Sequence, residues 1–81
     1  MRIKIKRLMD GPGPGETLVE VTTTAGNSEQ VVVHHTVIED DMIDVGNPIH
    51  EENDRALVEL PREAMSGNWR VWVPREEIAP Q

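Results

Sequence analysis

The sequence predicts a mainly β fold, either a small barrel or a compact sandwich of about five or six short antiparallel strands with one or two single helical turns. Apolar residues alternate with polar ones over short stretches, which is the period of a strand. Glycine, proline and asparagine separate these stretches, as in tight turns. A short alternating strand followed by Pro-Arg-Glu also occurs twice, at 57–65 and 70–78.

The chain is short and poor in aromatic residues, so its core is expected to be thin. Its 81 residues make one domain, 1–81, with 79–81 as a short tail. It has two Trp and no Phe or Tyr, so Val, Ile, Leu and Met carry nearly all the burial. A domain of this size buries only about 60% of its unfolded surface. Such a β-rich chain often depends on a partner, and we expect a homodimer.

The composition also indicates where in the cell the protein is located. No stretch approaches the roughly 20 apolar residues of a membrane span, and the N-terminal residues lack the apolar block of a signal peptide. The chain has no Cys, which excludes disulfides, thiolate metal sites and a cysteine nucleophile. These features indicate a soluble cytoplasmic protein without a membrane partner.

The formal net charge of -7 is unevenly distributed. Four cations lie in the first predicted strand, namely Arg2, Lys4, Lys6 and Arg7. Polyanion binding is driven by basic patches, so the acidic balance argues against a nucleic-acid partner. The lysines alternate with Ile3 and Ile5, which is typical of a strand with one solvated face and which discourages edge-to-edge aggregation.

The first strand is predicted at 2–9, with Ile3 and Ile5 pointing inward. The loop at 10–16 has alternating glycines and prolines, a composition that a phosphate-binding loop also shows. Phosphate loops are followed by a helix, however, whereas a β-branched strand follows here, and Glu16 would repel an anion. The segment therefore indicates a stiff connection between strands.

The next strands are predicted to form a hairpin. The second strand covers 17–24, the Ala-Gly-Asn-Ser turn covers 25–28, and the third strand covers 29–38. Three successive valines at 31–33 indicate partial burial on both faces. These two strands should pair directly.

The acidic middle of the chain is predicted to be mostly loop. Three like charges at 39–41 interrupt the pattern, and a brief strand follows at 42–45. Gly-Asn-Pro at 46–48 turns the chain, and 49–55 is a polar connection to the terminal hairpin.

The terminal hairpin pairs 56–60 with 69–73 around a turn at 66–68. Every second residue is apolar, which places one set on the inner face: Ala56, Val58, Leu60, Trp69, Val71 and Val73. The prolines that follow each strand end the pairing and favour a helical turn, at 61–65 and at 74–78. Met65 and Ile78 would then fold back as apolar plugs over the core.

This rhythm of strands is similar to that of SH3-like barrels, in which a helical turn near the C-terminus follows a long hairpin. The analogy concerns architecture and implies no function. The proline-binding groove of SH3 domains is lined by aromatic residues, and a chain without Tyr and Phe cannot build it.

The outer face of the terminal hairpin is the predicted partner-binding surface. Trp72 should emerge there beside Arg70 and opposite Leu57, and exposed Trp and Arg are enriched in binding hot spots. The alternative is that the Arg70 stem and Leu57 cover Trp72 within the domain. Either another protein or a second copy is the expected occupant of an open face.

A second constellation has the chemistry of a metal site. In extended geometry His50, Glu52 and Asp54 share a face and offer nitrogen and oxygen ligands to a divalent cation. Their spacing matches no zinc signature, and the run at 39–44 does not match a calcium loop. His34 and His35 are adjacent in a predicted strand, so they should point to opposite faces.

Catalysis finds no support in the sequence. Paired carboxylates need a cleft that separates their pKa values, and both serines fall in predicted turns. We therefore predict a small interaction module or accessory subunit that is not an enzyme and has no cofactor. A domain that binds a divalent metal or small ligand through the acidic, His-containing loop is the alternative.

Overall fold

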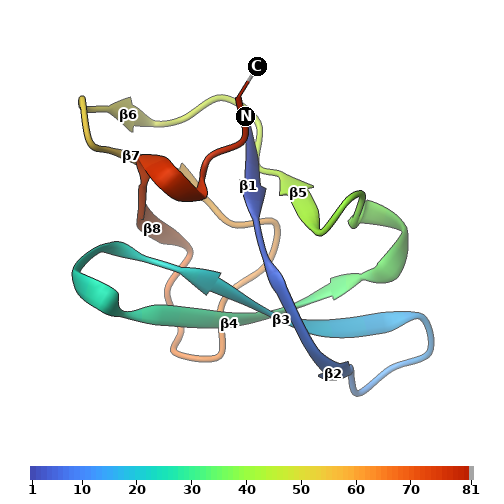
Figure 1. The fold of residues 1–81 in the computed structure, drawn as a ribbon. Coiled ribbons are helices and arrows are strands. Elements are labelled where there is room, and N and C mark those ends of the chain that lie inside the picture. Colours follow the sequence, from blue (N-terminus) through green and yellow to red (C-terminus); the bar gives the residue numbers. More distant parts are fainter. Residues whose placement is uncertain (81) are drawn as a thin grey trace.

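The computed structural model describes residues 1–80, which form a mainly β domain as the sequence predicts (Figure 1). In this range the strands are β1 (Arg2–Lys4), β2 (Lys6–Asp10), β3 (Glu16–Thr22), β4 (Ser28–His34), β5 (Met42–Asp44), β6 (His50–Glu51), β7 (Arg55–Glu59) and β8 (Arg70–Pro74). They form three antiparallel sheets, β1–β5, β2–β3–β4 and β6–β7–β8, which do not join into one closed barrel. Single 3₁₀ turns are η1 (Thr24–Gly26), η2 (His35–Val37) and η3 (Arg75–Glu77). None of the helical segments within 1–80 is long and apolar enough to cross a membrane.

The predicted strand at 2–9 divides at Ile5 because the chain changes partners there. β1 pairs with β5, and β2 pairs with β3. Figure 1 shows β1 and β2 as one extended run that crosses β3. The Ile5 amide donates to the Asp41 carbonyl at 2.9 Å, and this is where pairing toward β5 ends. The other side of β1 is bridged by Ile3 to Ile78.

β3 and β4 form the predicted hairpin, with a register that runs from Glu16 opposite His34 to Thr22 opposite Ser28. Its turn has Ala25 and Gly26 at φ values of 62° and 73°. Two successive left-handed residues match the twist of a tight hairpin. The turn is therefore built by glycine and a strained alanine.

The predicted strand at 29–38 is too long. β4 ends at His34, where the Thr36 amide donates to His34 Nδ1 at 3.3 Å and begins η2. Because the strand stops between the two histidines, their placement on opposite faces is wrong: both are exposed and their rings stack with centroids 4.8 Å apart. Ile38 follows the turn and is buried.

The acidic segment forms a tight turn that leads into β5. Glu39 and Met42 exchange two backbone hydrogen bonds of 3.0 Å, with Asp40 and Asp41 between them at φ values of 54° and 55°. The short strand predicted at 42–45 is confirmed at Met42–Asp44.

The terminal hairpin is confirmed, with Leu57 opposite Trp72 and Glu59 opposite Arg70. The two-residue strand β6 adds to β7 where a loop was predicted, placing His50 opposite Leu57. The helical turn after Pro74 is present as η3, and Ile78 packs against the core as predicted.

The segment 61–65, which follows the first strand of the Pro-Arg-Glu repeat, does not form the turn predicted for it. No helical turn forms at 61–65, and Met65 is 70% exposed while Ala64 is buried in its place. Trp69 was predicted in the core but is 49% exposed. Trp69 lies just before β8, and its indole nitrogen donates to Glu63 in the exposed β7–β8 loop instead of entering the core.

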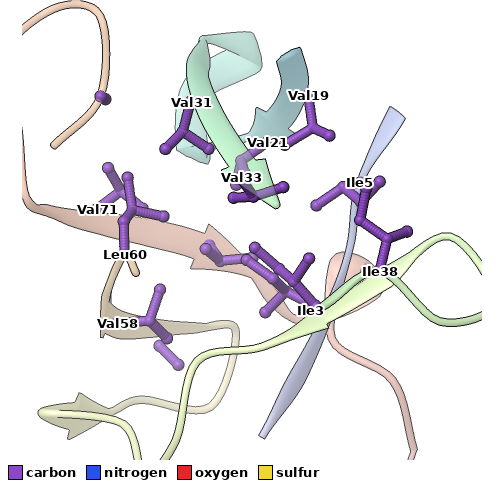
Figure 2. Packing of buried hydrophobic residues seen from close by; sticks show 14 residues of the cluster. Ile3, Ile5, Val19, Val21, Val31, Val33, Ile38, Val58, Leu60 and Val71 are labelled. Atoms are coloured by element: carbon purple, nitrogen blue, oxygen red, sulfur yellow. The ribbon is translucent and has the colours of Figure 1, made fainter. Parts of the chain in front are cut away.

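All three sheets contribute to one core that is wholly apolar. No polar or charged side chain in residues 1–80 is buried. Figure 2 shows side chains of the β3–β4 hairpin pointing toward those of β7 and β8, with Ile3 and Ile5 alongside. The buried side chains are Ile3, Ile5, Val19, Val21, Val31, Val33, Ile38, Ile43, Ala56, Val58, Leu60, Ala64, Val71 and Val73. Their alternation leaves the intervening residues on the outer faces.

Candidate partner-binding site

The outer side of β6–β7–β8, here called the hairpin face, carries the three residues predicted to bind a partner. Strand register places His50, Leu57 and Trp72 in one row across the three strands. Glu59 and Arg70 form the next row, toward the β7–β8 loop. The structure therefore brings Leu57, Arg70 and Trp72 together on one surface.

Trp72 is half-buried on this face, and the side chains of Arg55 and His50 pack against its indole. The guanidinium carbon of Arg55 lies 3.9 Å from the centroid of the Trp72 ring. The His50 ring meets the same indole edge-on, with centroids 5.9 Å apart. Cover by the Arg70 stem and Leu57 was the predicted alternative, and Arg55 is a contact that this alternative did not include. A cation over an indole face is attracted by the ring quadrupole.

Charges on the hairpin face are paired with one another. Arg55 Nε contacts Glu52 Oε1 at 2.8 Å, and this hydrogen bond lowers the pKa of the Glu52 carboxyl below its ordinary value. Arg70 Nε lies 3.4 Å from Glu59 Oε2. The face thus presents an apolar centre, Leu57 and Trp72, between two neutralised ion pairs.

The predicted metal ligands are only partly brought together. His50 Nε2 lies 3.6 Å from Glu52 Oε2, while Glu52 is also held by Arg55. Asp54 is exposed, and its backbone carbonyl accepts from the Arg75 amide at 2.9 Å. Across residues 1–80 no three His, Cys, Asp or Glu side chains are grouped so as to hold a metal ion.

Trp69 is the functional candidate that sequence reasoning missed. Its Nε1 donates to Glu63 Oε2 at 3.1 Å, and its carbonyl accepts from the Leu60 amide at 2.7 Å. Glu29 of β4 anchors the same loop, because its carboxylate accepts from Ser66 Oγ and Asn68 Nδ2 at 2.6 and 2.7 Å. Trp69 is therefore held in place with its ring half exposed. The signal in the sequence was the Gly-Asn turn immediately before it, which delays the start of the strand.

A hollow of about 210 Å³ lies between β8 and the turn of the β3–β4 hairpin. Its lining includes Trp72, Arg70, Asn68 and Glu29. The edge of the hairpin face is thus indented beside Arg70, and the indentation offers amide, carboxylate and guanidinium groups.

Comparison of the chain with protein-family models, with curated proteins and with solved structures finds no match.

Proposed function

We propose that the chain is a non-catalytic interaction module or accessory subunit that binds a protein partner through the hairpin face, extended by Trp69. The observation that carries the proposal is Trp69 itself, 49% exposed yet held by its bond to Glu63. Trp and Arg are the residues most enriched among binding hot spots. An aromatic side chain already fixed in the free protein loses little conformational entropy on binding. Arg70 and Trp72 follow Trp69 in the chain on β8, and their side chains lie on the hairpin face.

The test compares exposed residues on different surfaces. The partner that the wild-type chain retains from cells expressing it is identified and purified, and its affinity is measured for Trp69→Ala, Arg70→Ala and the control Val37→Ala. Val37 is 50% exposed and lies in η2, away from the hairpin face. We expect the Trp69 variant to weaken binding by about tenfold or more, which is about 1.4 kcal/mol. The control should bind as the wild type does.

Sedimentation over a range of protein concentrations tests a second copy as the partner. A homodimer that Trp69→Ala dissociates supports the hairpin face as a self-interface. Equal affinity of the Trp69, Arg70 and Val37 variants for every partner, with folding intact, would exclude the proposal.

A further inference from the structure

The outer edge of β2 is an unpaired sheet edge, separate from the hairpin face. β2 is the terminal strand in the order β2–β3–β4. On the side away from β3, the last backbone bond described in residues 1–80 is the one from the Ile5 amide to Asp41. The backbone N–H and C=O groups of successive residues in a strand point to alternate sides, so the Arg7 amide faces the same open side as the Ile5 amide. An extended segment can therefore add to β2 from Lys6 onward.

The edge is open because the neighbouring chain turns away. Asp40 and Asp41 adopt left-handed conformations and reverse the backbone between Glu39 and Met42. The side chain of Arg7 then reaches back to Asp41, with Nε 3.3 Å from Oδ1. Nothing in residues 1–80 pairs with the remainder of β2 on this side.

The side chains on the outer face of this sheet indicate which side chains an added strand would need. Register places Met9, Leu18 and Val32 in one apolar row, and the row ends at the open edge with Met9 63% exposed. Lys6 lies in the adjoining row, opposite Glu20. An added strand would continue both rows, with an apolar side chain beside Met9 and a further group beside Lys6.

The charges near the edge of β2 indicate which side chain should lie beside Lys6. Lys4 and Lys6 form no ion pair within residues 1–80, although the whole chain carries a formal net charge of -7. In a symmetric antiparallel pairing of two copies centred on Lys6 and Arg7, these cations would face like charges, which is destabilising; a pairing centred on Leu8 would instead place Lys6 opposite Asp10. The β-bulge between Arg7 and Met9 and the cations at the edge also discourage indiscriminate pairing.

We infer that β2 is a docking edge for an acidic, extended segment of another protein, which adds as a strand, places a carboxylate beside Lys6 and an apolar side chain beside Met9. Main-chain hydrogen bonds supply affinity in this mode, and alternate side chains supply specificity. The inference does not depend on the hairpin face, which lies on a different sheet.

The test uses the full chain, labelled with nitrogen-15, and a blocked synthetic peptide with Glu-Thr-Leu-Thr repeated twice. We expect saturable shifts of the backbone amides of β2, weakening with added salt. The matching Lys-Thr-Leu-Thr peptide should bind about tenfold more weakly or not at all. Lys6→Glu should reverse this preference.

Two substitutions at position 7 distinguish the contribution of the backbone amide to peptide binding from that of the side chain. Arg7→Ala and Arg7→Pro both remove the contact with Asp41, but only proline removes the outward amide. Peptide binding should persist in the alanine variant and be lost in the proline variant; if the proline variant does not fold, the reversal in Lys6→Glu decides. Absence of shifts, equal binding of both peptides, or peptide-free shifts of β2 that grow with protein concentration would overturn the inference, the last by making a second copy the occupant.

Discussion

Glu16 and Arg62, 46 positions apart in the chain, form an ion pair with Oε2 and Nη1 at 2.5 Å. The other carboxylate oxygen of Glu16 accepts from the Gly13 amide at 2.9 Å. One carboxylate therefore joins the glycine-rich turn, the start of β3 and the β7–β8 loop. The hydrogen bond from Arg62 is the largest of the effects that lower the pKa of Glu16 below its ordinary value of 4.5.

This link predicts a loss of stability in acid. Because the pKa of Glu16 is lower in the folded than in the unfolded chain, its contribution is present above about pH 4.5 and is lost as pH falls through the folded value. Glu16→Gln should lower the free energy of unfolding at neutral pH and flatten its dependence on pH below 4.5. Urea unfolding at a series of pH values measures both effects. Glu76→Gln, at an exposed position of η3, is the control, and an identical slope in the two variants would contradict the prediction.

The two tryptophans should contribute differently to stability. Trp72 is half-buried beneath Arg55, so Trp72→Ala is expected to cost about 2–3 kcal/mol. Trp69→Ala removes an exposed ring and one hydrogen bond and should cost about 1 kcal/mol or less. Urea midpoints at equal m-values provide the comparison. A larger loss of stability in the Trp69 variant than in the Trp72 variant would mean that Trp69 is the more buried of the two.

The β3–β4 turn contains a residue that glycine should improve. Ala25 has a φ of 62°, a left-handed conformation that costs an L-residue about 1–2 kcal/mol. Ala25→Gly relieves this cost but loses chain entropy, so we expect a net gain of about 0.5–1 kcal/mol in thermal unfolding. Ala56→Gly, in a buried strand position, should instead destabilise by about 1 kcal/mol or more. A destabilised Ala25 variant would contradict the turn geometry.

Two isoleucines test the boundary of the core. Ile43 is 1% exposed, so Ile43→Val should cost about 1 kcal/mol through the lost methylene and the cavity it leaves. Ile49 is 44% exposed, so Ile49→Val should stay within about 0.5 kcal/mol of the wild type. Chemical denaturation of both variants in parallel measures the difference, and equal losses would mean that Ile49 is more buried than the structure shows.

Much of the candidate site follows from sequence. A period of two placed Leu57 and Trp72 on the face opposite Val58 and Val71, and the hairpin register then set them side by side. Sequence reasoning did not find the role of Arg55. That residue lies across the sheet diagonal from Trp72, and its position depends on Glu52 in the preceding turn.

Sequence alone determined the mainly β class, the hairpins and the inward-facing residues of the first strand and, apart from Trp69, of the terminal hairpin, because alternation and turn chemistry act over a few neighbouring positions. Tertiary structure decided where the first strand exchanges β5 for β3 and that the Trp69 ring stays half exposed. The exchange of partners depends on a contact between distant segments, Ile5 with Asp41, which no local pattern encodes, and the loop before Trp69 is held by Glu29 of β4 through Asn68.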